Sequence, residues 1–352
     1  MPKNLRLTSL SKFLLPSLKP DALDADLFHS TRLLLQAGYI RAGSQGFVLL
    51  PMGQRVLNKL KALVHAELEL IGGLEVSLPT LQSIVMWKQS GRYFHQDLFH
   101  VDESTILAPT HEEEVTRLAS QVIHSYKQLP TILFQTGAKY RKEQRPRGGL
   151  LRTREFIMTD AYSFCQEQQK FLVYERVRQA FGEVFRKLGL QGCVQEADSG
   201  DIGGSLSHEW LLEADVGDDK VKESGRSAIE VAHTFILDDI YSKPFGATYK
   251  DTDGNVHNLS MGCYGIGLTR LMAAIQEHHR NEFLVWPPCI SPFDGILIPK
   301  ALDYSHDLFN GEYLLDDRFE KSMGMRLMEA RLSGIRPIYI LHRPGEEPEE
   351  IK

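Results

Sequence analysis

The sequence has few cysteines and no long apolar run, and both shortages limit what the protein can be. Its 352 residues include four cysteines, which are widely separated and form no Cys-x-x-Cys pair. This spacing argues against a disulfide scaffold and a zinc knuckle, and it favours a reducing compartment. No window approaches eighteen consecutive apolar residues. A transmembrane helix is therefore not expected, and a membrane is not among the expected partners.

The chain also lacks an excess of positive charge. Its formal net charge is -6, with 40 Lys and Arg against 46 Asp and Glu. A protein that coats nucleic acid through salt-driven contacts has the opposite balance, so DNA is not an expected partner and any RNA must meet a local basic patch. The apolar content of 42% and the length are typical of a globular protein with room for two domains.

The first segment, residues 1–30, has no acidic side chain before Asp21. Its basic residues are Lys3, Arg6, Lys12 and Lys19. This composition suits a short mitochondrial leader, and a structured first segment is the alternative interpretation. The mitochondrial matrix is the predicted location, with a bacterial-type cytoplasm as the alternative.

Hydrophobic periodicity predicts two long helices and several strands. The first helix is expected from Met52 to Ile71, and the second carries an aromatic stripe from Phe171 to Leu188 that should be core. Leu74 to Leu81 is expected as a strand, and Ala228 to Leu237 followed by Thr248 to Leu259 as a hairpin around Asp253-Gly254. These elements predict an α+β fold with an antiparallel sheet and flanking helices.

A second, small α/β domain is expected near the end of the chain. Its predicted elements are strands at Gly295–Ile298, Glu312–Leu315 and Pro337–Leu341 and a helix at Met323–Leu332. The expected domains are therefore an N-terminal segment at 1–30, a large domain at 31–289 and a small domain at 290–352.

An arginine-rich segment from Lys139 to Phe156 is the most informative feature of the sequence. Arginine recognises phosphate and carboxylate groups through planar, bidentate hydrogen bonds. Because Pro146 and a glycine pair interrupt the run, the segment is predicted to form a hairpin that grips a polyanion. A solvated basic loop is the plainer interpretation of the same composition.

A second segment, Pro109 to Glu114, combines a hydroxyl with three carboxylates. These groups suit an ammonium ion held by charge-assisted hydrogen bonds. The alternative is a helix start, with Thr110 as N-cap and Glu113 closing a capping box. A zinc protease is rejected, because Val115 stands where that motif needs a second histidine.

Two further segments carry candidate site residues. Gly262 to Arg270 is rich in glycine and is expected to run from a strand into a helix. It is not a dinucleotide-binding fingerprint, because the last glycine of that motif is missing. Close packing of a helix on a sheet is the alternative explanation of its glycines. Ile229 to Phe235 is expected as a strand. Its alternation should place Glu230, Ala232 and Thr234 on one face and His233 and Phe235 on the other.

Together and in this order, these segments resemble motifs one, two and three of class II aminoacyl-tRNA synthetases, and within that class the prolyl-tRNA synthetases. The matching blocks are residues 109–113, 125–130, 154–156, 160–164, 203–209 and 262–267. The resemblance makes 31–289 the catalytic domain and 290–352 an anticodon-binding domain.

The chain departs from that family in two places. About twenty residues separate Glu209 from Glu230, where the bacterial form usually carries an editing insertion, so editing within this chain is not expected. From Pro299 to Glu312 there is barely room for the helix that joins two parallel strands. The anticodon-binding domain is therefore expected to be shortened.

The resemblance implies a ligase that activates L-proline with ATP and passes the prolyl group to tRNA(Pro). It implies Arg141 and Arg270 as catalytic residues. The implied proline site is Thr110, Glu112, Arg141, Phe235, Cys263 and His208. The implied ATP site is Arg141, Glu143, Arg152, Thr153, Phe156, Glu230, His233 and Arg270. Mg²⁺ would bridge the phosphates, with ligands that the sequence does not assign.

The resemblance also implies a homodimer, in which the helix Met52 to Ile71 and Pro79 meet their copies across a two-fold axis. A catalytically inactive accessory or interaction protein is the first alternative, which the shortened domain favours and the joint presence of the arginines opposes. A serine or threonine ligase is the second, opposed because no zinc-type cluster is evident.

Overall fold

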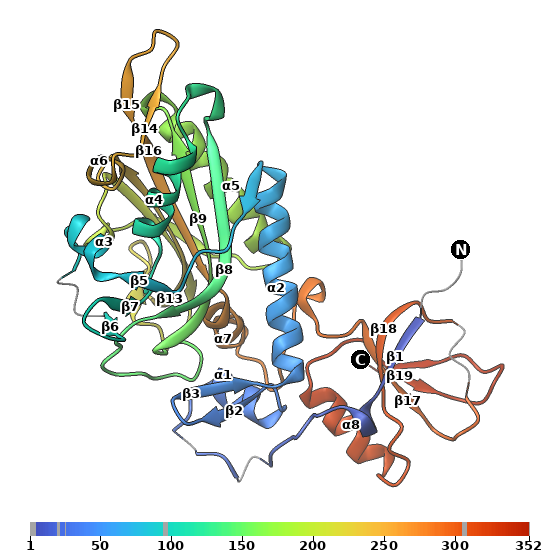
Figure 1. Cartoon of the computed structure of the whole chain (residues 1–352). Coiled ribbons are helices and arrows are strands. Elements are labelled where there is room, and N and C mark those ends of the chain that lie inside the picture. Colours follow the sequence, from blue (N-terminus) through green and yellow to red (C-terminus); the bar gives the residue numbers. More distant parts are fainter. Residues whose placement is uncertain (1–4, 20–21, 25, 94–97, 305–307, 352) are drawn as a thin grey trace. The chain divides into compact units, whose positions relative to one another are not determined.

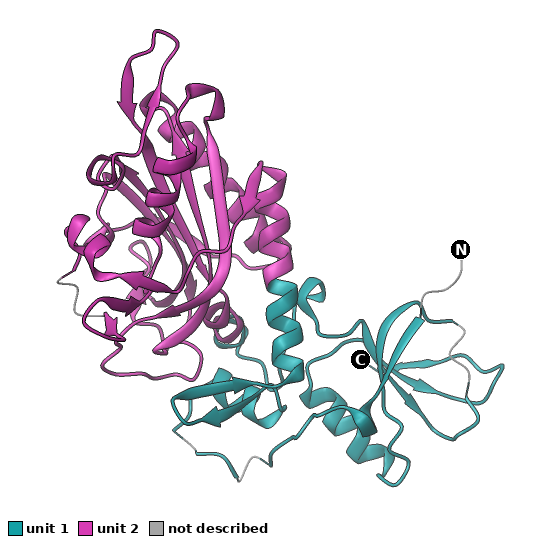
Figure 2. Cartoon of the chain, viewed as in Figure 1, with its two compact units in different colours: residues 1–60, 275–352 teal, residues 61–274 magenta. Residues whose placement is uncertain are grey.

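The computed structural model describes residues 5–19, 22–24, 26–93, 98–304 and 308–351. The chain divides into two compact units, one of residues 1–60 and 275–352 and one of residues 61–274 (Figure 2). The divisions fall inside helices α2 (Pro51–Leu70) and α7 (Leu268–His279). The functional domain limits expected from the sequence stay predictions.

The unit of residues 61–274 is built on one large sheet (Figure 1). Its strands, in spatial order, are β10 (Cys193–Glu196), β11 (Leu206–Glu213), β13 (Ser227–Asp238), β16 (Ser260–Gly267), β9 (Glu155–Cys165), β8 (Thr131–Tyr140) and β4 (Gly73–Glu75), with β12 (Asp219–Lys220) paired to β13. The pairs are antiparallel except that of β4 with β8. An antiparallel sheet of this kind is what the sequence predicts.

Helices cover both faces of this sheet. Helix α5 (Lys170–Lys187) packs on one face, where Tyr174 bonds Thr234 and Phe181 contacts Tyr264. Helix α4 (Glu112–Val122) packs on the other, where Val115 and Ala119 share a core with side chains of β13 and β16. Because side chains alternate along a strand, neighbouring residues of β16 serve the two helices in turn.

Smaller elements complete this unit. They are α3 (Ile84–Gln89), α6 (Ser242–Phe245), the sheet of β5 (Leu81–Ser83), β7 (Thr105–Leu107) and β6 (Phe99–His100), the hairpin of β14 (Thr248–Lys250) and β15 (Val256–Asn258), and the short helices η3 (Tyr126–Gln128), η4 (Glu167–Gln169) and η5 (Gly200–Ile202).

The other unit contains a five-stranded sheet in the order β1 (Leu5–Ser9), β18 (Gly311–Leu315), β17 (Gly295–Pro299), β19 (Ile338–Leu341) and β20 (Glu349–Ile351). Its further elements are α1 (His29–Gln36), β2 (Ile40–Gly43), β3 (Gly46–Leu49), α8 (Met323–Leu332), η1 (Leu10–Lys12) and η6 (Pro288–Ile290). Strands β17 and β18 are parallel, and their connection holds no helix in its described residues, 300–304 and 308–310.

Most of the predicted elements are present, and three details of the prediction are wrong. Leu74 to Leu81 is not one strand, because Pro79 cannot donate to a ladder and separates β4 from β5. The hairpin turn at Asp253-Gly254 joins β14 to β15, whereas β13 belongs to the main sheet. Phe171 lies outside the core, with 59% of its surface exposed. Across the described residues, every helix is too short or too polar to cross a bilayer.

Candidate active site

A pocket of about 370 Å³ opens in the unit of residues 61–274. The loop before α4 contributes Thr110, and the first residue of that helix is Glu112. Strands β9, β13 and β16 and the segment 198–202 supply most of the remaining wall, and three arginines complete it. The lining includes Arg92, Thr110, Glu112, Arg141, Phe156, Met158, Asp160, Glu230, His233, Phe235, Cys263 and Arg270. Residues far apart in the sequence are thus brought to one cavity.

Glu112 is a fully buried carboxylate held by donors on both oxygens. Its Oε1 accepts hydrogen bonds from Thr110 Oγ1 at 2.8 Å and Cys263 Sγ at 2.9 Å. Its Oε2 accepts one from Arg92 Nη1 at 3.2 Å. Burial opposes ionisation, but Arg92 and these donors outweigh it, so the pKa of Glu112 is lowered. The pocket therefore contains a fixed anion.

The alternative interpretation of Thr110, as the N-cap of helix α4, is wrong. Helix α4 begins at Glu112 with His111 as its N-cap, and no side chain caps it. The Thr110 hydroxyl donates to the Glu112 carboxylate instead. A charge-assisted bond to a buried anion is stronger than a neutral bond to a backbone amide, which explains the preference.

Arg92 is a site residue that the sequence analysis missed. It hydrogen-bonds Glu112 and also Glu113, whose Oε1 lies 3.1 Å from Arg92 Nη1. Burial and the charge of Glu112 raise the pKa of Glu113, although Arg92 opposes this shift. Because Arg92 lies twenty residues before Glu112 in a segment without a recognised motif, only the fold brings the two together.

Asp160 lies at the pocket wall above a buried polar network. Its Oδ1 is 2.6 Å from Lys139 Nζ, and its Oδ2 accepts hydrogen bonds from Tyr162 and Gln135 at 2.8 and 3.0 Å. The Tyr162 hydroxyl in turn accepts one from the backbone N–H of His111. Burial, together with the charge of Lys139, lowers the pKa of His111 to about 4. This network fixes the loop that carries Thr110 and leads into Glu112.

The two predicted catalytic arginines both line the pocket. The guanidinium carbon of Arg141 lies 5.2 Å from the centre of the Phe156 ring. Arg270 Nε donates to the carbonyl of Leu151 at 2.9 Å, and its Nη1 donates to the carbonyl of Glu230 at 3.2 Å. These contacts fix the direction of both cations, as recognition of a phosphate requires.

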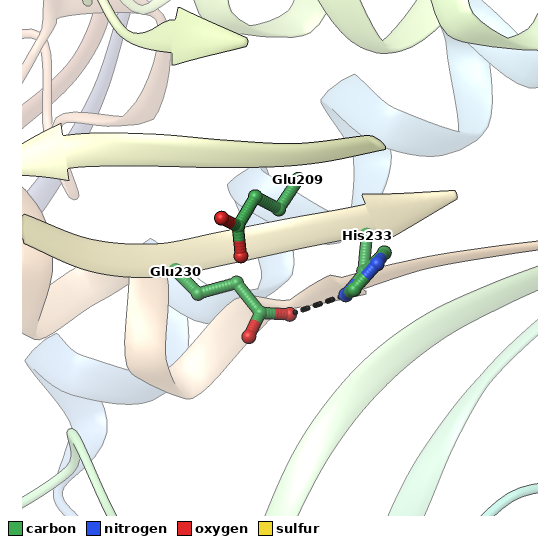
Figure 3. Close-up of side chains that lie close together, drawn as sticks. All are labelled: Glu209, Glu230 and His233. Atoms are coloured by element: carbon green, nitrogen blue, oxygen red, sulfur yellow. Dashed lines mark hydrogen bonds and ion pairs between the residues drawn. The ribbon is translucent and has the colours of Figure 1, made fainter. Parts of the chain in front are cut away.

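Glu209, Glu230 and His233 form a small cluster (Figure 3). Glu230 and His233 also line the pocket. One ligand atom from each lies within 4.8 Å of the others, and Glu230 Oε1 is 3.1 Å from His233 Nδ1. Burial would raise the pKa of Glu230, but His233, Arg270 and Arg141 outweigh it and lower the pKa. The pKa of Glu209 is raised, chiefly by burial.

This cluster corrects the predicted alternation along β13. Glu230 was expected on the face opposite His233, yet the two side chains are bonded. The register with β11 explains the difference: Trp210 faces Ala232, whereas Leu211 faces Glu230, which leaves Val231 as an extra residue. Such a β-bulge turns the following side chain to the other face of the sheet. His233 also stacks on Phe235, with ring centres 4.1 Å apart.

Four predicted site residues do not line this pocket. Glu143, Arg152 and Thr153 lie in the connection between β8 and β9, where Glu143 Oε2 accepts a hydrogen bond from Arg152 Nε at 2.6 Å. His208 Nδ1 lies 2.8 Å from the hydroxyl of Tyr174, on the face of the sheet that α5 covers. The predicted contact of His208 with proline is therefore not supported by the geometry.

Comparison with known proteins places this chain in a family. Residues 95–279 match the model of the tRNA synthetase class II core domain (G, H, P, S and T). A proline–tRNA ligase of Rhizobium etli is 33% identical, over 95% of this chain and 92% of the relative. A probable mitochondrial proline–tRNA ligase of Schizosaccharomyces pombe is 35% identical, over 87% of this chain and 84% of the relative.

Solved structures show the same fold. Prolyl-tRNA synthetase of Giardia lamblia, in complex with prolyl-adenylate, superposes with a TM-score of 0.78 at 20% identity, covering 88% of this chain and 68% of that one. The enzyme of Cryptosporidium parvum, complexed with L-proline and AMP, gives 0.75 at 16% identity, covering 92% and 72%. The α+β class II fold, the enzyme class and the function predicted from the sequence are confirmed, and the chain belongs to the proline–tRNA ligases.

Proposed function

We propose that this chain binds L-proline and ATP in the described pocket, forms prolyl adenylate, and transfers the prolyl group to tRNA(Pro). The observation that carries the proposal is that a buried anion, Glu112, and a cation, Arg141, line the same cavity. An amino acid carries one charge of each sign, so the pocket complements it at both ends. Phe235 and Cys263 line the same cavity and would contact the proline ring.

The first step joins two anions, and the site offers what that step needs. A carboxylate oxygen of proline attacks the α-phosphorus of ATP, and the bond from that phosphorus to pyrophosphate breaks. Arg141 would neutralise charge between the two reacting groups, and Arg270 would hold the γ-phosphate. The enzyme thereby combines positioning with electrostatic stabilisation. Phe156 offers a ring face for adenine, and Glu143 an acceptor for its amino group.

In the second step a hydroxyl of the terminal ribose of tRNA attacks the prolyl carbonyl carbon, and AMP leaves with the electron pair of the broken bond. No covalent bond to the enzyme is required. Arg152 and Thr153 lie in the connection between β8 and β9. We expect both residues to contact the triphosphate of ATP.

Mg²⁺ fits the residues of this site. It prefers oxygen ligands and keeps several waters, and the carboxylates of Glu230 and Glu209 supply such oxygens. The nitrogen of His233 is the less suitable third ligand for this ion. When bound, Mg²⁺ would neutralise charge on the ATP phosphates. Glu230 is ready for this role because its lowered pKa keeps it ionised.

A homodimer is proposed as the working form. Helix α2 and the strand that follows it leave large apolar side chains uncovered: Leu70 is 75% exposed and Leu74 59%. A two-fold contact would bury them against their copies. Light scattering coupled to size exclusion should give twice the mass of the chain at assay concentrations. A fully active monomer would contradict this proposal.

The compartment and the small domain are the remaining proposals. We place the protein in the mitochondrial matrix, in line with its relative in Schizosaccharomyces pombe, and keep a bacterial-type cytoplasm as the alternative. Residues 5–9 form strand β1, paired with β18, as the structured alternative for this segment expects. A fluorescent protein fused behind residues 1–30 should enter mitochondria if these residues also act as a leader. We propose that residues 290–352 form a shortened anticodon-binding domain. Changes in the anticodon should then lower charging without affecting proline activation.

Charging of tRNA tests the proposed function. The purified chain, supplied with ATP and Mg²⁺, should attach labelled proline to tRNA(Pro). Threonine should be attached far less efficiently than proline, because burying its hydroxyl against the Phe235 ring costs free energy that burying the proline ring does not. Alanine should be excluded only partly, since a methylene or two is worth about 1 to 3 kcal/mol of discrimination. Absence of both adenylate formation and charging would instead favour the catalytically inactive accessory protein.

A further inference from the structure

We propose that Arg92 is a positioning residue that keeps Glu112 ionised and thereby makes the pocket require a cationic nitrogen in its substrate. The inference deepens the proposed function and rests on it. Arg92 would act through Glu112, without a role in the chemical step. Its loss should therefore change which ring the pocket accepts more than the rate at which bound proline reacts.

Arg92 is held rigidly beside the two carboxylates. Its Nη1 lies 3.2 Å from Glu112 Oε2 and 3.1 Å from Glu113 Oε1, and its side chain is only 11% exposed. Its guanidinium carbon also lies 4.9 Å from the ring centre of Trp87 and 5.5 Å from that of Tyr241. A guanidinium stacked on aromatic rings and bonded to carboxylates is well placed for a buried ion pair.

The carboxylates need this cation because both are fully buried. A carboxylate taken out of water without a partner binds a proton and becomes neutral. Neutral Glu112 would still offer a carbonyl oxygen, but it would lose its charge attraction for an ammonium group. Arg92 is therefore the group that makes Glu112 selective for a cation.

The other titratable groups around Glu112 add no net charge at neutral pH. Burial raises the pKa of Tyr162 on β9, of Tyr241 before α6 and of Cys263 on β16, so all three stay protonated and neutral. Burial lowers the pKa of His111, beside Glu112 in the chain, to about 4, so it stays neutral as well. Asp160 is paired with Lys139. The charge balance of this cluster is thus set by Arg92, Glu112, Glu113 and the substrate.

The test compares proline with tetrahydrofuran-2-carboxylate, which has an uncharged ether oxygen in place of the ring nitrogen. The KM for proline and the inhibition constant of the ether are measured by pyrophosphate exchange for the wild type, Arg92→Gln and Arg92→Lys. Arg117→Gln is the matched control, because Arg117 pairs with Glu114 on the same helix and is 46% exposed.

We expect Arg92→Gln to raise the KM for proline and to leave binding of the ether almost unchanged. The preference for proline over the ether should fall about ten-fold or more, because the loss of a charge-assisted hydrogen bond changes the binding constant by about that factor. Arg92→Lys keeps the charge and should retain most of the preference. The KM of Arg92→Gln should also recover as pH rises, because Glu112 then loses its proton, whereas the wild type should stay flat from pH 6 to 8.

Equal weakening of proline and the ether would show a merely structural role for Arg92 and overturn the inference. If Arg92→Gln does not fold, the double variant Arg92→Gln, Glu113→Gln removes one buried anion together with the cation. The double variant should show the same loss of preference for proline over the ether. If it kept the wild-type preference, the inference would be overturned. If the wild-type chain shows no proline-dependent exchange, the proposed function itself is contradicted. This result is distinct from a failure of the inference on Arg92, which is measured in the variants.

Discussion

The carboxylate of Asp160 lies 2.6 Å from the ammonium group of Lys139, and both side chains are almost completely buried. Each charge is the other's counterion, since burial without a partner is costly for both. The pair does more than stabilise the sheet, because Asp160 also accepts a hydrogen bond from Tyr162, which bonds the backbone of His111. The geometry of the loop that leads into Glu112 therefore depends on an ion pair between strands β8 and β9.

Replacing Asp160 with Asn should destabilise the fold strongly. The variant leaves Lys139 charged and buried without a counterion, a change that costs about 3 to 5 kcal/mol. Urea unfolding followed by circular dichroism measures the difference. The double variant Lys139→Met, Asp160→Asn should recover part of the loss, because it removes both charges. A single variant as stable as the wild type would show that the ion pair contributes little.

His111 predicts how stability depends on pH. Its pKa is about 4 in the folded protein, below the ordinary value of 6.5. Between these values the unfolded chain binds a proton that the folded chain does not, so stability falls as pH falls from 6.5 towards 4. The contribution amounts to roughly 3 kcal/mol over that range. The His111→Gln variant should lose less stability than the wild type over the same interval, and equal losses would contradict the assignment.

Arg270 predicts a loss of activity without a loss of stability. The Arg270→Gln variant removes a cation that lines the pocket, and such preorganised donors are worth about a hundred-fold to a thousand-fold in rate. Arg226→Gln is the control, since Arg226 forms an exposed pair with Glu213. Initial rates of adenylate formation should fall for the first variant and stay unchanged for the second. If the two variants formed adenylate at equal rates, Arg270 would have no role in this reaction.

The cysteines predict an ordered pattern of alkylation. The thiolate is the reactive form, and burial together with Glu112 raises the pKa of Cys263 well above its usual value. Cys289 is exposed. Iodoacetamide at pH 8 should therefore modify Cys289 in the native protein and reach Cys263 only after unfolding, as peptide mass spectrometry would record. Equal rates at the two sites would mean that the pocket opens freely.

Much of the fold follows from periodic patterns in the sequence. The apolar spacing from Met52 to Ile71 predicts α2 almost to the residue, and the elements of the small sheet were located in the same way. These predictions succeed because burial of one face imposes the pattern locally. The prediction for Phe171 is wrong because it lies in the first turn of α5, where the position fits the stripe but 59% of its surface stays exposed.

The site was predicted less completely, for identifiable physical reasons. Arg141, Arg270 and Glu112 were found because they belong to motifs, whereas Arg92 reaches Glu112 only through the tertiary fold. Glu230 was assigned to the wrong face because one extra residue, Val231, shifts the register of β13. His208 was assigned to proline although it faces α5, since strand alternation alone does not say which face holds the pocket.

Proline-dependent exchange of pyrophosphate into ATP is the most direct test of the account. The purified chain should catalyse the exchange with proline, and the Arg141→Gln variant should lose about a hundred-fold or more while unfolding at the same urea concentration. That result would establish adenylate formation in the described pocket. Absence of exchange from a folded wild-type chain, or full exchange from the variant, would contradict it.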